Sequence, residues 1–143
     1  MSDAHAAISA LIFTYAERID AGDLAGVAAL FADATFRSVQ GGSYRGSAAV
    51  LEVLTRLVIL HADGTPRTKH VTTNLVIEAD EAAGTAAARS YFTVLQASDR
   101  VALQPIVAGR YHDRFVRDGA TWRFDDRLIS IDLVGDLSDH LRG

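Results

Sequence analysis

His70 lies in the segment TKHVTTNLVIEAD, residues 68–80, in which polar and apolar side chains alternate over the length of a strand. The alternation places His70, Thr72 and Asn74 on one side of this strand, away from the more apolar row. A histidine side chain ordinarily titrates near pH 6.5, about where a general base works best. Two interpretations are open: a structural histidine hydrogen-bonded near the start of a strand, or a base in a pocket.

Asp20 is the first candidate partner for His70. Apolar residues spaced three and four apart predict an amphipathic helix that ends near Gly22: Ile8, Leu11, Ile12, Tyr15 and Ile19. Asp20 falls in the last turn, where the helix dipole disfavours an anion, so we expect it to have a specific partner. If the Asp20 carboxylate accepts a hydrogen bond from one ring nitrogen of His70, the second ring nitrogen is free to take a proton. This is the arrangement of a Ser-His-Asp triad without its serine. The alternative is a solvated residue or a turn hydrogen bond.

Arg127 is the second candidate, in the segment WRFDDRLISIDLV. It shares its strand side with Ile129, Ile131 and Leu133. An inward arginine requires an anion, either an aspartate or a substrate's developing charge. The alternative is a rim arginine paired with Asp125 or Asp126. Trp122 and Phe124 fall on the opposite side of the predicted strand from Arg127. Either a bulge lies between them or both faces of the strand are buried.

Other residues receive weaker assignments. The tyrosines Tyr15 and Tyr44 could donate phenolic hydrogen bonds into a pocket, and Asn74 could orient a ligand. In GRYHDRF, residues 109–115, charged and aromatic side chains alternate, so cross-strand ion pairs are the expected role. No metal site is predicted, because the five histidines form no HExxH motif or close pair. His140 lies near the chain end and is given no role.

The remaining pattern supplies the elements that must position these residues. Asp23 can cap a short second helix from Leu24 to Phe31. ATFRSV, Gly41-Gly42 and SYRG predict a strand, a turn and a return strand, and Ser47 can cap a third helix. Strands are predicted at 69–79, 85–97, 102–117 and 121–134. The expected architecture is one α+β domain, residues 1–143, with three N-terminal helices on one face of a curved, mostly antiparallel sheet.

Composition excludes several classes of function. The 143 residues include 14 basic and 18 acidic side chains spread along the chain, so no nucleic-acid footprint is present. There is no cysteine, which rules out thiolate chemistry and disulfides. No apolar run approaches the roughly 20 residues of a membrane span, and no signal peptide is recognisable, so the cytoplasm is the expected compartment. No P-loop, GxGxxG or GxSxG occurs, and no cofactor is expected.

Three stretches resemble landmarks of the SnoaL-like branch of the nuclear-transport-factor-2-like superfamily: YAERIDAGDLAGVAALFAD, the YRG turn before a helix, and RYHDRFVRDGATWRFDDR. The resemblance implies a cone-shaped fold in which helices close a strongly curved sheet around a pocket. That superfamily includes dehydratases, isomerases, hydrolases, cyclases, dioxygenase small subunits and binding modules.

A narrower resemblance concerns the site. Scytalone dehydratase and lindane dehydrochlorinase have an aspartate and a histidine at positions that fall on Asp20 and His70, and the dehydrochlorinase has an arginine that falls on Arg127. The second histidine of scytalone dehydratase would fall near Val94 or Leu95, so that site is incomplete here. The resemblance implies a cofactor-free lyase or isomerase acting on a small hydrophobic cyclic molecule. The alternative is a non-catalytic ligand-binding or assembly module, like a ring-hydroxylating dioxygenase small subunit.

An assembly is also expected. Apolar residues on both parities of 121–134 would leave an apolar outer sheet face, and relatives pair through the sheet, so we expect a homo-oligomer, a dimer or a trimer.

Overall fold

The computed structural model describes residues 3–143. Three helices come first, interrupted by a short β-hairpin, and four long strands follow. The elements in chain order are α1 (Asp3–Asp20), α2 (Leu24–Ala29), β1 (Thr35–Ser38), β2 (Ser43–Arg45), α3 (Ser47–Leu57), β3 (Thr68–Asp80), β4 (Thr85–Gln96), β5 (Gln104–Asp118) and β6 (Thr121–Val134). The predicted long strands thus agree with the observed ones to within two residues.

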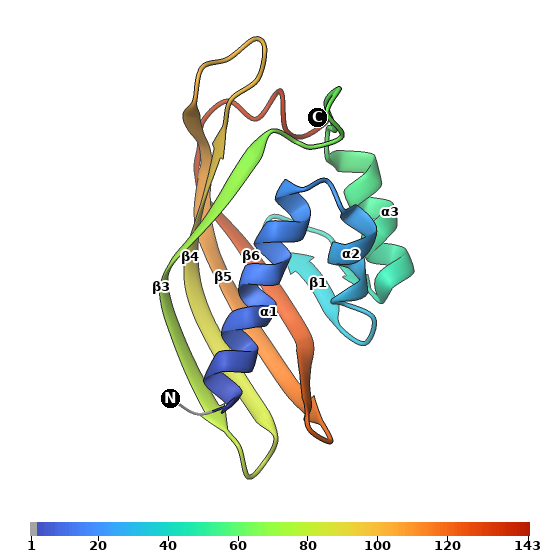
Figure 1. Cartoon of the computed structure of the whole chain (residues 1–143), viewed down its shortest axis with the longest axis vertical. Coiled ribbons are helices and arrows are strands. Elements are labelled where there is room, and N and C mark those ends of the chain that lie inside the picture. Colours follow the sequence, from blue (N-terminus) through green and yellow to red (C-terminus); the bar gives the residue numbers. More distant parts are fainter. Residues whose placement is uncertain (1–2) are drawn as a thin grey trace.

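The strands form one six-stranded sheet in the order β2-β1-β6-β5-β4-β3. Only the β1–β6 pair is parallel, and all other neighbouring strands are antiparallel. The sheet is strongly curved but open, with β2 and β3 at its edges. Figure 1 shows α1 lying across the concave face of the long strands and α2 and α3 packed beside β1. The α+β prediction with helices on one sheet face is confirmed.

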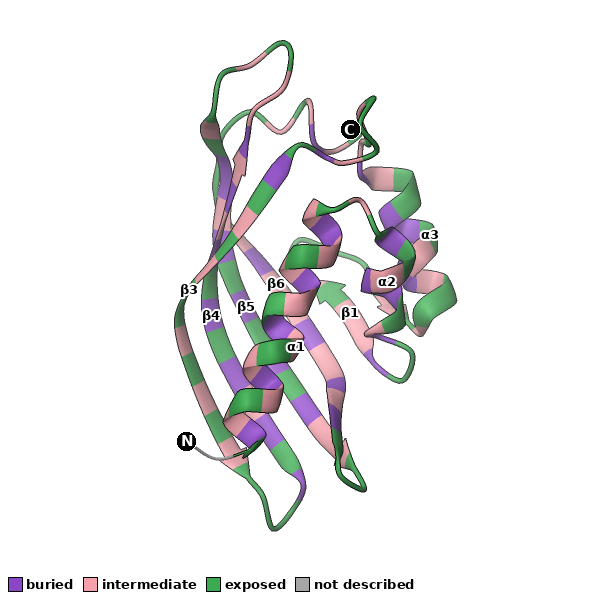
Figure 2. Ribbon diagram, in the orientation of Figure 1, coloured by how far each residue is buried: buried purple, intermediate pink, exposed green. Residues whose placement is uncertain are grey.

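The core lies between α1 and the concave face. The face of α1 that is apolar in the sequence is buried, including Ile8, Ile12, Tyr15 and Ile19. Figure 2 shows buried residues alternating with exposed ones along the long strands, as expected when only one sheet face is covered. At the centre, Phe124 stacks on Phe31 with ring centroids 4.9 Å apart. This packing fixes the segment after α2 against β6.

A β-bulge changes the alternation within β3. The register with β4 shifts between Thr73 and Val76, and Asn74 adopts a positive φ of 53°. His70 lies on the inner side, and beyond the bulge Leu75 takes the inner side too, whereas Val76 is exposed. The prediction that His70 lies opposite the more apolar row therefore does not hold for the residues after the bulge. The strict alternation expected for 68–80 is wrong from Asn74 onward, because an extra residue in one strand inverts every later side chain.

A second bulge explains the mixed parity of β6. The β5–β6 register shifts between Arg114 and Phe115, so Phe124 and Arg127 both lie on the concave side. The predicted bulge is present, and burial on both faces is not needed to explain the pattern. Leu133 was expected on the same side as Arg127 but is 69% exposed. The β5–β6 register shifts again between Ala108 and Gly109, which turns Leu133 to the other face.

The helix starts differ in how they are capped. Asp23 caps α2 as predicted, with its Oδ1 accepting from the backbone N–H of Gly26 at 2.9 Å. Helix α3 is preceded by Gly46, and no side chain caps it, so the predicted capping by Ser47 is wrong. Gly46 has φ of 85°, a conformation that glycine adopts without steric penalty, and Ser47 already belongs to the helix.

Candidate functional site

A largely apolar cavity of about 270 Å³ lies between the concave sheet face, helices α1 and α3, and the C-terminal segment. Aliphatic and aromatic side chains make up most of its wall, among them Ile19, Phe36, Leu54, Phe92, Val94, Val107, Ile129, Ile131, Leu137 and Leu141. Two histidines, His70 and His140, and three tyrosines supply polar groups to the wall. A concave, mostly apolar pocket with a few polar groups is typical of small-molecule sites.

Asp20 and His70 meet at this wall. The Nδ1 atom of His70 lies 2.6 Å from Oδ1 of Asp20, within the distance predicted from the sequence. The same carboxylate accepts from the backbone N–H of His70 and from the hydroxyl of Thr68, both at 2.8 Å. Because the carboxylate receives the proton on Nδ1, Nε2 of His70 is the nitrogen that can accept a proton. The end of α1 and the start of β3 thus fix the imidazole and its tautomer.

The pair is largely shielded from water, with side chains 9% exposed for His70 and 11% for Asp20. Burial alone would raise the pKa of Asp20. The hydrogen bonds and positive charge offered by His70, with the Thr68 hydroxyl, outweigh burial and hold this pKa below its ordinary value. The carboxylate is therefore charged at neutral pH and can stabilise an imidazolium.

The predicted tyrosines both line the cavity. Tyr15 comes from α1 and Tyr44 from β2. A third, Tyr111 from β5, was assigned only a structural role within GRYHDRF, yet it also lines the cavity and stacks on Phe92 at 4.5 Å. Burial is the main reason why the pKa values of Tyr15 and Tyr111 are raised, so both phenols keep their protons.

Arg127 does not line the cavity. It is fully buried, and its Nε and Nη2 donate to the two carboxylate oxygens of Asp113 at 2.8 and 3.0 Å. The guanidinium lies 3.6 Å from the ring centroid of Tyr111 and 4.3 Å from that of Tyr15. The proposed partners at positions 125 and 126 are wrong, because Asp113 stands directly opposite on β5. Arg127 thus supports the tyrosine wall from behind, with its charge balanced within the protein.

Asn74 lies on the other side of the sheet from His70. Its exposed side chain borders a groove on the convex face, with Tyr91 and Arg110. The expectation that Asn74 orients a ligand beside His70 is therefore wrong, because the β3 bulge turns it outward. No feature of the single sequence marks a bulge at Thr73 and Asn74, apart from the tolerance of asparagine for positive φ.

The sequence reasoning missed His140. Far from being at a loose chain end, it is 5% exposed and lines the cavity, with its ring 6.0 Å from that of His70. Its backbone carbonyl accepts from Ile59 N–H at 2.8 Å, and Leu141 forms a bridge with Val58. The four-residue spacing of Leu137 and Leu141 around His140 is the signal that could have indicated a packed segment.

Asp139 fastens this segment to two loops. Its carboxylate accepts from Ser98 Oγ at 2.7 Å and from Arg100 Nη2 at 2.6 Å. Its carbonyl lies 2.9 Å from Nε2 of His61 and accepts from Gln96 Nε2 at 3.0 Å. These contacts hold the neighbouring His140 in the cavity wall. They also give a structural role to the loop that contains His61.

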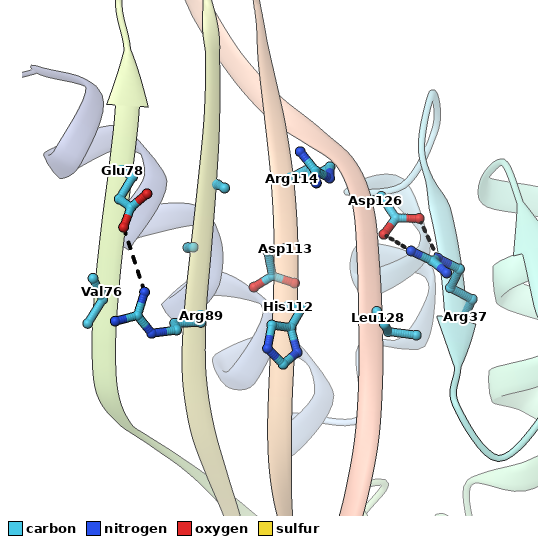
Figure 3. A pocket seen from close by; sticks show the side chains of 11 residues that line it. Arg37, Val76, Glu78, Arg89, His112, Asp113, Arg114, Asp126 and Leu128 are labelled. Carbon is cyan, nitrogen blue, oxygen red and sulfur yellow. Dashed lines mark hydrogen bonds and ion pairs between the residues drawn. The ribbon is translucent and has the colours of Figure 1, made fainter.

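A second depression, of about 390 Å³, lies on the convex face and surrounds His112 (Figure 3). Charged side chains border it and pair with one another. Arg37 contacts Asp126 at 2.8 Å and Arg89 lies 3.7 Å from Glu78. We place the candidate site in the apolar cavity, because the Asp20–His70 pair in its wall is shielded from water, and hydrogen bonds in a shielded site are stronger than at an open charged surface.

Two further observations bear on cofactors and membranes. Within residues 3–143, no group of three or more histidine or carboxylate side chains is arranged to hold a metal ion. Over the same residues, no helix has both the length and the apolar character that crossing a membrane would require.

A curved, open sheet covered by helices over an apolar cavity, with a buried acid–histidine pair in the cavity wall, defines an α+β fold of the cone type. The model of the SnoaL-like domain matches residues 1–127. The chain therefore belongs to the SnoaL-like family, as its sequence landmarks indicated. No protein of curated function matches it in sequence.

Solved structures share the fold. Rv3472 from Mycobacterium tuberculosis, of unknown function, is 28% identical with a TM-score of 0.74, over 92% of this chain and 73% of that one. A protein from Novosphingobium aromaticivorans, provisionally named a scytalone dehydratase, is 21% identical with a TM-score of 0.73, over 93% and 87%. LinA is 21% identical with a TM-score of 0.72, over 94% and 90%.

Proposed function

We propose that this protein is a cofactor-free lyase or isomerase that removes a proton from a small, largely apolar cyclic substrate. His70 acts as the general base through Nε2, and Asp20 holds its tautomer and stabilises the imidazolium. The observation that carries the proposal is the 2.6 Å contact between Asp20 and His70 in the wall of an apolar cavity. The likeness to a protein named as a dehydratase supports it at the level of the fold.

The same residues account for substrate binding. The apolar wall favours a ring system with little polar surface, and Tyr15 and Tyr44 offer phenolic hydrogen bonds to it. Arg127 acts on the substrate only through the tyrosines it supports, since Asp113 already neutralises its charge. The leaving group or enolate therefore does not depend on direct contact with Arg127.

Hydrogen–deuterium exchange tests the proposal without knowledge of the natural substrate. 1-Tetralone, a cyclic ketone with enolisable protons at one carbon, is incubated with the protein in D₂O, and loss of that proton signal is followed by NMR. We expect catalysed exchange in the wild type, and a rate about 10²- to 10⁴-fold lower in His70→Ala, the usual size of a general-base contribution. Asp20→Asn should also slow exchange while the protein stays folded.

His112→Ala is the matched control, because it removes an imidazole from the exposed convex face. Its exchange rate should equal that of the wild type. Exchange that survives in His70→Ala would contradict the proposal. Binding of 1-tetralone without any exchange in the wild type would contradict it as well, and would favour a non-catalytic ligand-binding or assembly module.

A further inference from the structure

His140 is a second imidazole in the cavity wall, one that the general-base mechanism does not use. Its Nδ1 is buried and has no hydrogen-bond partner among residues 3–143. A buried polar group without a partner is unfavourable by about 1–3 kcal/mol, so such groups call for an explanation. The ring lines the cavity, but Nδ1 itself is shielded from it, so a bound molecule can pair with this atom only if the ring turns toward the cavity.

The two imidazoles are close but not equivalent. The ring of His140 packs edge-on against that of His70, with centroids 6.0 Å apart and planes at 69°. Burial, together with the nearby His70 and His61, lowers the pKa of His140 to about 4, although Asp20 opposes this. His140 is therefore neutral at physiological pH, including when His70 carries a proton. A neutral imidazole can donate a hydrogen bond without repelling the imidazolium beside it.

We propose that His140 contacts the substrate directly and donates a hydrogen bond to the oxygen of an enolisable carbonyl compound while His70 removes the adjacent proton. This inference rests on the function proposed above and names its substrate class. His70 Nε2 takes the proton from the α-carbon, the C–H electron pair becomes a carbon–carbon double bond, and the carbonyl π pair moves to oxygen. Charge that develops on this oxygen strengthens the hydrogen bond from His140.

The proton then returns in one of two ways. In an isomerase, the imidazolium of His70 delivers it to another carbon of the enolate, and the carbonyl is restored. In a dehydratase, the imidazolium protonates a β-hydroxyl, which leaves as water while the enolate electrons form the new double bond. Neither route needs an oxidant or a further reactant, and His140 stays neutral in both.

Binding of an enol analogue tests the contact separately from turnover. 1-Naphthol carries its oxygen where the enol of 1-tetralone does, and naphthalene has the same rings without oxygen. Affinities of both are measured by titration calorimetry for the wild type, His140→Phe, His70→Phe and the control His112→Phe. We expect His140→Phe to weaken binding of 1-naphthol about 3- to 10-fold, the value of one hydrogen bond, and to leave naphthalene unchanged.

A preference for 1-naphthol over naphthalene that persists in His140→Phe overturns the inference. So does failure of the wild type to bind either molecule. If the preference depends on His70 alone, the inference fails, while His70-dependent exchange of 1-tetralone still supports the proposed function. The opposite result is a preference for 1-naphthol that depends on His140 while the wild type does not exchange the protons of 1-tetralone. That result contradicts the proposed function. It also overturns the part of His140 in an enolisation step, because His140 would then only bind the ligand.

A second measurement covers the case in which His140→Phe does not fold. In the wild type, the ring resonances of His140 are followed by NMR as 1-naphthol is added, with assignment from His140→Gln. A shift of these resonances, larger with 1-naphthol than with naphthalene, is expected if the ring donates to the oxygen. Equal responses to the two molecules would overturn the proposal.

Discussion

At the scale of single residues, the site depends on the different environments of two histidines. His70 is held by a carboxylate that stays charged, because its hydrogen bonds to His70 and Thr68 lower the pKa of Asp20 despite burial. His140 has no such carboxylate, and burial keeps it neutral. In the proposed mechanism two side chains of one type thus take the parts of base and neutral donor, because one is paired with a carboxylate and the other is buried without one.

This difference predicts how stability depends on pH. The pKa of His140 falls from an ordinary 6.5 to about 4 in the folded protein, so the unfolded chain binds the extra proton first. Stability should therefore decrease as pH falls from about 6.5 to about 4, by up to about 3 kcal/mol from this group. Urea unfolding at several pH values measures it. In His140→Phe this part of the pH dependence should disappear, whereas in His112→Phe it should remain.

At the scale of elements, β5 and β6 are joined by a buried ion pair. The side chains of Asp113 and Arg127 are both fully buried, and Arg127 donates two hydrogen bonds to the Asp113 carboxylate. Their contact also orders the rings of Tyr15 and Tyr111, over which the guanidinium lies. The segment GRYHDRF thus combines two cross-strand ion pairs, made by Arg110 and Asp113, with one cavity residue, Tyr111.

The pair predicts a non-additive response to substitution. Asp113→Ala leaves Arg127 charged and unpaired inside the protein and should lower the free energy of unfolding by about 3–5 kcal/mol. The double variant Asp113→Leu with Arg127→Met should recover most of this loss, because no buried charge remains. Urea unfolding of the variants measures both. Asp132→Ala, which breaks the exposed pair with Arg110, is the control and should have a much smaller effect. Equal losses in the single and double variants would contradict this account.

The bulge in β3 gives a second prediction at this scale. Asn74 holds φ at 53°, a left-handed conformation that glycine adopts freely and that residues with a Cβ adopt at a penalty of about 1–2 kcal/mol. Asn74→Gly should therefore retain or raise the melting temperature, whereas Asn74→Ala should lower it. Since the side chain lies on the convex face, neither change should alter 1-naphthol binding. Thermal unfolding and the same titration check both expectations. Weaker binding of 1-naphthol by Asn74→Ala would contradict them.

At the scale of the whole molecule, association through the convex sheet face stays a prediction. The bulge in β6 removes one reason for it, because Trp122, Phe124 and Ile129 share the concave side. Another reason replaces it: Val71, Val76 and Tyr91 are exposed on the convex face among paired charges. A second copy of the chain could cover these side chains, with the charges arranged around them.

Light scattering after size exclusion tests this expectation. We expect a dimer or a trimer at micromolar concentration. Tyr91→Asp, which places a charge among exposed apolar residues, should shift the protein toward the monomer without changing its circular dichroism. Leu103→Asp, at an exposed residue in the loop before β5, is the matched control and should leave the mass unchanged. A monomeric wild type would refute the prediction.

Much of this protein could be predicted from its sequence because the information is local. Apolar spacing defines α1, alternation and turn residues define the four long strands, and Asp20 at the unfavourable end of a helix indicates a specific partner. Alternation placed His70 opposite the more apolar row of its strand, and only the bulge after Thr73 brings Leu75 and Ile77 to the same side as His70. The neighbourhood of Asp20 and His70 could be proposed before any coordinates.

Tertiary structure decided the rest, because it depends on contacts between distant segments. A single extra residue at Asn74 or Asp125 inverts a strand's faces, and nothing local marks its position. The partner of Arg127 is settled by the β5–β6 register, which places Asp113 opposite it. His140 enters the cavity only because Asp139 is bound by loops about 40 and 80 residues earlier in the chain. Such long-range pairings depend on the packing of the whole chain, and a sequence read segment by segment does not contain them.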